Sequence, residues 1–344
     1  MIEIRINEGD AGQRSDKYLI RLLPGASKSL IYKQIRKKNI TLNGKKMDGR
    51  EKLVAGDKMQ LFFSEETYKK FLSATNDDEL KNICAIATKA YGQLNGIDII
   101  YEDNNIILMN KPAGVLSQSV AGNEPSLNEW LIGYLLSNGF IDIDSISHFK
   151  PSVLNRLDRN TSGIVIGSKS LLGAMTISEM LKERTLDKYY LAYVLGELNG
   201  NGRLEGYHVK DNLVNKVLIK EKLDENDNPD EYDRVITEYK SIKSFNHDRL
   251  SFVSLLEVKL VTGKSHQIRA HLASIEHPII GDIKYGNKKH DKALFSLHIN
   301  NQLLHAYKLI FSDKMPEGMD NLSGKCFECK MPDSWSIVDG YMEK

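Results

Sequence analysis

Cysteine and long apolar runs are scarce in this chain of 344 residues. Its three cysteines, Cys84, Cys326 and Cys329, are too few for a disulfide framework and favour a reducing compartment. The first sixteen residues are charged from the third position and lack the apolar core of a signal peptide. No run of about 18 apolar residues is present, so no membrane span is expected. We therefore expect a cytoplasmic protein that does not associate with a membrane.

An excess of charge of one sign is also lacking. The chain has 47 basic and 46 acidic residues, which gives a formal net charge of +1. No global field therefore attracts nucleic acid, and any such attraction must come from local patches. The length predicts about two domains of roughly 100–200 residues each. A monomer is the default expectation for the oligomeric state.

A local basic patch is present near the N-terminus, where residues 12–63 are predicted to form a small domain. Between Lys28 and Lys58 the chain carries ten lysines and arginines against three acids. Apolar residues at helical spacing from Leu30 to Ile35 predict a helix with a cationic outer face, which Ser27 could cap. The sequence Asn43-Gly44 after a short apolar run predicts a hairpin.

A charge run of this kind is often only a solvated helix face. Here the cations extend from the helix into the hairpin, which is more than one helix face requires. This is the kind of local patch from which an attraction for nucleic acid would come, and the candidate residues are Lys33, Arg36, Lys37 and Lys45. Residues 64–97 show a weak helical pattern and are predicted to be a helical linker. Residues 98–344 are predicted to form the second domain.

The second domain begins with signs of mixed helices and strands. Apolar stretches at 99–101 and 106–109, separated by a polar turn, predict a hairpin. Helical spacing predicts a helix over 170–183, and alternation predicts strands over 188–196 and 256–260. The acidic run 224–230 is predicted to be a solvated connection that faces away from any phosphate backbone.

The most informative segment is 155–163, with the sequence NRLDRNTSG. Asp158 lies between Arg156 and Arg159, and nearby cations favour the ionised carboxylate. Small residues that allow a tight turn follow it, and the apolar run 164–166 then predicts a buried strand. A carboxylate in a loop at the mouth of a strand, with arginines that could hold phosphates, suits chemistry on a nucleotide. From this local pattern alone, a surface loop with ordinary ion pairs is an equally good interpretation.

The same segment resembles the H-R-L-D-x-x-T-S-G motif of the RluA-type pseudouridine synthases, with Asn155 where that family commonly has histidine. Four further segments resemble motifs of the family in the right order: 110–114 (NKPAG), 188–196 (KYYLAYVLG), 262–271 (TGKSHQIRAH) and 277–286 (HPIIGDIKYG). In the third of these motifs Lys264 replaces an arginine, which keeps the charge but loses the two-pronged geometry. The stretch 27–46 resembles the S4 RNA-binding domain.

This resemblance implies a fold and a set of site residues. The fold would be α+β, with a mixed, mainly antiparallel sheet and a central cleft in the catalytic domain, preceded by a small S4-like domain. Asp158 would be the catalytic carboxylate, Arg269 would pair with it, and Tyr190 would pack on the target base. Further RNA contacts are expected from Arg156, Arg159, Lys264, His266 and Lys111, although for Lys111 the bracing of its own loop is the favoured role.

The implied reaction is the conversion of uridine in RNA to pseudouridine, which requires no cofactor and no metal. The histidines at 266 and 271 lack the spacing and the acid of a zinc motif, and the single C-x-x-C at 326–329 cannot complete a zinc site. Large-subunit ribosomal RNA is the expected substrate, and transfer RNA is the alternative. A non-catalytic RNA-binding assembly factor and a glycoside hydrolase are rival hypotheses. A glycoside hydrolase would need a second carboxylate, which the motifs do not offer.

Overall fold

The computed structural model describes residues 1–7, 10–72, 77–119, 124–211, 216–225, 227–286 and 288–339. The chain divides into two compact units. The first comprises residues 1–93, 128–152 and 168–175, and the second comprises 94–127, 153–167 and 176–344. The domain boundaries predicted from the sequence stay predictions. In the described ranges, no helix is both long enough and apolar enough to cross a membrane.

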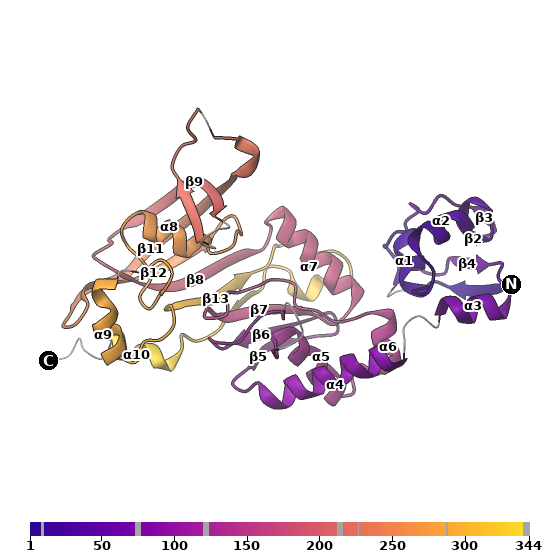
Figure 1. Ribbon diagram of the computed structural model, residues 1–344, viewed down its shortest axis with the longest axis horizontal. Coiled ribbons are helices and arrows are strands. Elements are labelled where there is room, and N and C mark those ends of the chain that lie inside the picture. Colours follow the sequence, from indigo (N-terminus) through magenta and orange to yellow (C-terminus); the bar gives the residue numbers. More distant parts are fainter. Residues whose placement is uncertain are drawn as a thin grey trace. The chain divides into compact units, whose positions relative to one another are not determined.

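The first unit begins with a four-stranded sheet in the order β1-β4-β2-β3 (Figure 1). Its elements are β1 (Ile2–Arg5), α1 (Ser15–Leu22), α2 (Lys28–Arg36), β2 (Ile40–Leu42), β3 (Lys45–Lys46) and β4 (Lys58–Leu61). The predicted helix and hairpin are confirmed: Ser27 accepts the Leu30 N–H at 3.3 Å, and Asn43 and Gly44 have φ angles of 52° and 74°. Two successive positive φ angles are typical of the turn that joins a tight hairpin. That this segment is an S4-like domain stays a prediction.

Four further helices follow the small sheet. They are α3 (Glu65–Leu72), α4 (Asp77–Gln93), α5 (Leu127–Ser137) and α6 (Ile143–His148). The first two lie in the segment that was predicted to be a helical linker. Gly133 of α5 allows a close approach to α4, because a Cβ atom there would lie 2.3 Å from the carbonyl oxygen of Ala87. Tyr91 of α4 packs its ring against Trp130 and Tyr134 of α5.

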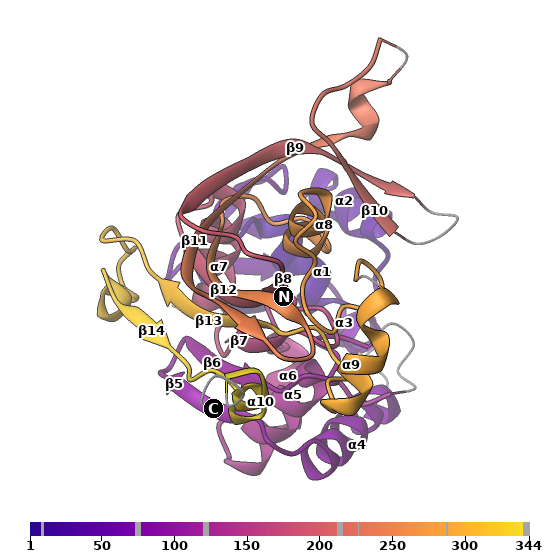
Figure 2. The ribbon, with the colours of Figure 1, turned by 90° about the vertical axis from the view of Figure 1, so that its left-hand side faces the viewer.

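The second unit is built on a ten-stranded sheet in the order β10-β9-β11-β12-β8-β13-β7-β6-β5, with β14 paired to β13 (Figure 2). The β13–β7 pair is parallel, and the other pairs whose register is known are antiparallel. The strands are β5 (Asp98–Glu102), β6 (Ile106–Lys111), β7 (Ser162–Ser168), β8 (Asp187–Leu195), β9 (Asn201–Asp211), β10 (Lys216–Lys220), β11 (Asp233–His247), β12 (Ser251–Leu260), β13 (Leu304–Ile310) and β14 (Cys326–Glu328). The predicted α+β fold with a mixed, mainly antiparallel sheet is confirmed.

Short helices connect or cover these strands. They are α7 (Leu171–Glu183), α8 (Gln267–Ser274), α9 (Asp291–Ser296), α10 (Ser336–Asp339) and the 3-10 turns Pro229–Glu231, Lys288–His290, Asp320–Leu322 and Asp333–Trp335. The predicted hairpin at 99–109, the helix at 170–183 and the strand at 188–196 match β5–β6, α7 and β8. The predicted strand at 256–260 is the second half of β12.

A buried core holds β7 in place beside β13. Ile164, Val165 and Ile166 are each no more than 1% exposed, so the predicted buried strand is confirmed. Gly163 has a φ of 113°, and a Cβ atom there would lie 2.2 Å from the carbonyl oxygen of Ala306 on β13. Only glycine permits this approach. The loop that carries Asp158 therefore runs directly into a strand whose position is fixed.

Candidate active site

Asp158 lies in a cleft of about 1040 Å³ in the second unit. The residues that line this cleft include some from the loop before β7, from α7 and β8, and from the segment that follows β12. Motif segments that lie far apart in the sequence thus meet at one place. The candidate residues that line it are Arg156, Asp158, Arg159, Tyr190, Lys264, His266 and Arg269.

The backbone of the Asp158 loop is held from three sides. The Ser117 hydroxyl donates to the carbonyl oxygen of Leu157 at 2.9 Å and accepts the Leu157 N–H at 3.0 Å. The Thr161 N–H donates to the carbonyl oxygen of Asp158 at 3.0 Å and closes a turn. The side-chain oxygen of Asn155 accepts the Ile166 N–H at 2.7 Å, which ties the loop to β7. Asn155, which departs from the family motif, therefore acts here on the backbone.

Lys111 is fully buried, and its role follows from its partners. Its ammonium donates to the carbonyl oxygens of Pro112 at 3.0 Å, Val115 at 2.8 Å and Arg159 at 3.0 Å. Three carbonyl acceptors match the three N–H donors of the charged form. Burial lowers the pKa of Lys111 to about 7, and the charge of Asp158 opposes that shift. The predicted contact of Lys111 with RNA is not supported by this position, whereas the bracing of the loop is.

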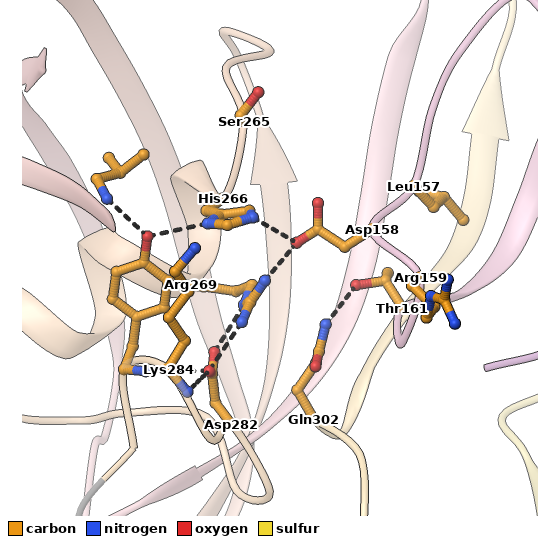
Figure 3. A network of polar contacts seen from close by, with 12 residues as sticks. Leu157, Asp158, Arg159, Thr161, Ser265, His266, Arg269, Asp282, Lys284 and Gln302 are labelled. Carbon is orange, nitrogen blue, oxygen red and sulfur yellow. Dashed lines mark hydrogen bonds and ion pairs between the residues drawn. The ribbon is translucent and has the colours of Figure 1, made fainter. Parts of the chain in front are cut away.

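Arg269 on α8 bridges two carboxylates (Figure 3). Its Nη1 donates to Asp158 Oδ2 at 2.6 Å, while Nε and Nη2 donate to the two oxygens of Asp282 at 2.7 and 2.9 Å. Asp282 is itself buried and also accepts the N–H groups of Lys284 and Tyr285. Burial opposes the charge of Arg269, but the bonds and charges of both acids outweigh it and raise its pKa. The guanidinium is thus charged and fixed in orientation.

The two oxygens of the Asp158 carboxylate have different surroundings. Arg269 Nη1 contacts Oδ2 of Asp158, and His266 Nε2 lies 3.8 Å from the same oxygen. No hydrogen bond from the described residues reaches Oδ1. The Asp158 side chain is 29% exposed and lines the cleft. Figure 3 shows both contacts meeting at a single oxygen while the other points away.

His266 lies just outside the helix that carries Arg269. A helix starting at Ser265 would have put His266 and Arg269 on one face, but α8 begins at Gln267. His266 is the residue before the helix and has a left-handed φ of 54°. Both side chains nevertheless reach Asp158, although only Arg269 lies within the helix. Burial lowers the pKa of His266, with the charge of Asp158 acting the other way.

Tyr190 on β8 lies between Val258 of β12 and Ala306 of β13 in the sheet register. Its side chain lines the cleft, and the residue is 7% exposed. Burial, followed by the nearby charge of Asp158, raises its pKa, so the phenol is neutral. A neutral aromatic ring in the cleft wall is suited to stack against a base.

The remaining candidate cations are exposed. Arg159 pairs with Glu124 at 2.6 Å, and Lys264 pairs with Asp233 at 2.7 Å. Arg156 is exposed at the cleft, and in the described part of the chain it forms no ion pair. In the first unit the predicted RNA contacts are also exposed, namely Lys33, Arg36, Lys37 and Lys45. These residues are available to a phosphate backbone.

Other groups were missed or have structural partners. Asp282 and Ser117 received no role from the sequence, although Asp282 lay inside a recognised motif. His271 is buried, and its Nδ1 lies 2.7 Å from the Thr237 hydroxyl. In the C-x-x-C segment, Cys329 Sγ lies 3.1 Å from His305 Nε2. Among the residues that the structure describes, no group of three or more histidines, cysteines or acids is placed to hold a metal ion.

This chain is similar to known proteins of one family. The family model described as RNA pseudouridylate synthase matches residues 105–274. The chain is 33% identical to ribosomal large subunit pseudouridine synthase C of Rickettsia bellii, over 85% of this chain and 89% of that one. It is 28% identical to the protein of the same name from Vibrio vulnificus, over 91% and 89%. Among solved structures, human RNA pseudouridylate synthase domain containing 1 matches with a TM-score of 0.50 and 20% identity, over 71% and 87%.

Proposed function

Because the chain belongs to the RNA pseudouridylate synthase family, and so is an enzyme that isomerises uridine in RNA to pseudouridine, we propose that Asp158 carries the reaction on large-subunit ribosomal RNA. The observation that carries the assignment of Asp158 is its anchoring. Arg269 holds Oδ2 at 2.6 Å, Asp158 lines the cleft, and Oδ1 accepts no hydrogen bond from the described residues. Relatives named as ribosomal large subunit synthases, which match over most of their length, support the substrate.

The reaction is an internal rearrangement. The N1–C1′ bond of the uridine breaks, the base turns, and C5 bonds to C1′ while its proton is lost and N1 gains one. All atoms of the product come from the substrate and water, so the rearrangement needs no donor and no redox partner. It needs an anionic carboxylate near C1′, either as nucleophile at that carbon or as the base that removes a ribose proton. Asp158 Oδ1 suits both roles, since Arg269 holds Oδ2 and so orients the carboxylate.

The base must leave its helix before it can enter the cleft. Base flipping costs roughly a few kcal/mol, and stacking of a base on an aromatic ring contributes about 1–3 kcal/mol. The neutral ring of Tyr190 in the cleft wall would provide that stacking. Arg156, exposed at the same cleft, would fill the vacated position or hold a flanking phosphate. Arg159, Lys264 and the cations of the first unit would contact the backbone further out.

The first experiment maps pseudouridines in ribosomal RNA by carbodiimide labelling and primer extension. The RNA is taken from cells with the protein, from cells without it, and from cells that carry only Asp158→Asn. We expect stops that are present in the first sample and absent from both others. An unchanged ribosomal RNA map would reject this substrate, and the same labelling of transfer RNA would then test the alternative. Stops that persist with Asp158→Asn would reject the role of Asp158.

A further inference from the structure

The phenol oxygen of Tyr285 lies behind His266, on the side away from Asp158. Tyr285 follows Asp282 in the turn after α8, and its oxygen accepts the backbone N–H of Val217 on β10 at 2.9 Å. The same oxygen lies 3.0 Å from His266 Nδ1, and the two rings meet edge to face with centroids 5.7 Å apart. In the described part of the chain, these are the two hydrogen-bond partners of the phenol oxygen.

These contacts favour one placement of the hydrogens. A backbone N–H can only donate, so the phenol oxygen is the acceptor from Val217. The hydroxyl hydrogen then has one remaining acceptor among the described residues, which is His266 Nδ1. A neutral imidazole that accepts at Nδ1 carries its hydrogen on Nε2. The lowered pKa of His266, caused first by burial, is consistent with this neutral ring.

The hydrogen on Nε2 points toward the catalytic carboxylate. Nε2 lies 3.8 Å from Asp158 Oδ2, the oxygen that Arg269 already holds at 2.6 Å. The distance is longer than that of a hydrogen bond, which in a free enzyme is common for contacts that tighten only when substrate is bound. A second donor at Oδ2 leaves Oδ1 as the oxygen that faces the substrate.

We propose that Tyr285 is a positioning residue: it holds His266 as the tautomer with hydrogen on Nε2, and thereby aims a second donor at Asp158 Oδ2. This proposal rests on the proposed role of Asp158. It also gives the strand pair β9–β10 a part in the site, because the backbone of Val217 fixes the phenol. A ring without the hydroxyl would keep its packing on His266 but would no longer select the tautomer.

The test uses Tyr285→Phe in the full-length protein and reads the tautomer directly. Ring nitrogen shifts of the nine histidines are recorded by long-range proton–nitrogen NMR, and His266 is assigned by its absence in His266→Gln. We expect wild-type His266 to carry its hydrogen on Nε2 and Tyr285→Phe to show a mixture of both tautomers. A wild-type hydrogen on Nδ1, or a spectrum that Tyr285→Phe leaves unchanged, would overturn the proposal. Since this readout needs no turnover, it is independent of whether Asp158 is catalytic.

Kinetics then separate positioning from binding. Tyr285→Phe should lower kcat roughly 2- to 10-fold, the rate equivalent of one hydrogen bond, with KM for RNA unchanged. Tyr232→Phe is the matched control, since its hydroxyl donates to Asp227 at 2.7 Å outside the cleft, and it should leave both constants unchanged. An altered tautomer with an unchanged kcat would reject the positioning role. A rise in KM alone would instead indicate an RNA contact, and would also reject it.

His266 variants supply a second check that does not depend on Tyr285→Phe folding normally. His266→Gln can place an amide N–H near the position of Nε2, whereas His266→Asn places it near that of Nδ1. We expect His266→Gln to retain more of kcat than His266→Asn. We also expect Tyr285→Phe to cause no further loss in the His266→Gln background. Equal losses for the two His266 variants would count against the donor at Nε2.

Discussion

Two arginines in the second unit each bridge two carboxylates, one in the cleft and one on the outer strands of the sheet. Arg203 on β9 contacts Glu205 at 2.7 Å and Glu238 at 2.5 Å, and its side chain is 49% exposed. Arg269 contacts Asp158 and Asp282 at similar distances, but its side chain is only 7% exposed. The two arginines form hydrogen bonds of similar length, but Arg203 is exposed to water and Arg269 is buried.

Burial decides what each of these bridges can do. Around Arg203, water screens the charges and competes for every hydrogen bond, so the bridge constrains little. Around Arg269, removal of the guanidinium would leave the Asp282 carboxylate buried without a charged partner, which costs about 3–5 kcal/mol. The buried bridge therefore fixes the orientation of Asp158, and the exposed bridge is an ordinary feature of a charged surface. Variants of the two bridges and of other cations can test this contrast.

Removal of the negative charge of Asp158 should have the largest effect on turnover. Asp158→Asn keeps the shape of the side chain but removes the anion that the reaction requires. We expect turnover to be abolished while the dissociation constant for RNA stays nearly the same, since Asp158 itself does not attract phosphates. Single-turnover assays and filter binding on the same RNA would measure both. A loss of binding comparable to the loss of rate would contradict the assignment.

Replacement of Arg269 by lysine should have the next largest effect on kcat. Arg269→Lys keeps the positive charge, but an ammonium cannot span Asp158 and Asp282 as the planar guanidinium does. We expect kcat to fall by roughly 10²-fold, as for the removal of one preorganised donor in an active site. Arg203→Lys is the matched control on the exposed bridge and should leave kcat unchanged. Equal losses in the two variants would show that burial is not what distinguishes them.

Lys111 extends the comparison of buried and exposed cations, because it is a buried cation whose partners are all backbone carbonyls. Lys111→Met should loosen the loop that carries Asp158 and lower kcat by roughly tenfold, since small displacements of a catalytic group are costly. The exposed Lys314→Met is the control and should have no such effect. Steady-state kinetics on one RNA substrate would check both variants. A wild-type kcat in Lys111→Met would mean that the loop does not need this brace.

Lys111 also predicts a dependence of stability on pH. Burial lowers its pKa in the folded protein to about 7 from an ordinary value of 10.5. Between these values the unfolded chain binds more protons than the folded one, so this group makes stability rise with pH. The unfolding free energy of wild type relative to Lys111→Met should therefore increase between about pH 7 and pH 10. Urea unfolding at several pH values measures this difference, and a flat difference would mean that the ammonium is not destabilised by burial.

The same contrast explains which parts of the site could be predicted from the sequence. Regular elements such as β7 and the hairpin at Asn43-Gly44 follow from local patterns, because burial and turn geometry leave a mark within a few residues. The pairing of Arg269 with Asp158, 111 residues apart, was expected only through the resemblance to a family. Sequence alone cannot tell a buried cation from an exposed one. Lys111 was therefore included among the RNA contacts, although its loop-bracing role had been favoured.

Residues that act through the backbone or through other side chains were the hardest to predict. Ser117 holds the Leu157 backbone, and Asp282 holds Arg269, yet neither residue type is unusual at its position. Their partners lie 40 and 13 residues away, so no local spacing identifies them. For Asp282 a signal existed, because the acid lay in a recognised motif. For Ser117 we find no such signal.

The smallest expected effect concerns the exposed cations of the first unit. A triple variant with alanine at Lys33, Arg36 and Lys37 removes charges that, in the described residues, form no ion pair. If these side chains bind phosphates, kcat at saturating RNA stays unchanged, KM rises, and the slope of log K against log salt falls by about 1 for each phosphate that is no longer neutralised. Lys314→Ala is an exposed control on the second unit. A change in kcat with an unchanged salt slope would mean that these cations act on the structure rather than on RNA. The distinction between buried cations that position catalytic groups and exposed cations that attract RNA would then not hold.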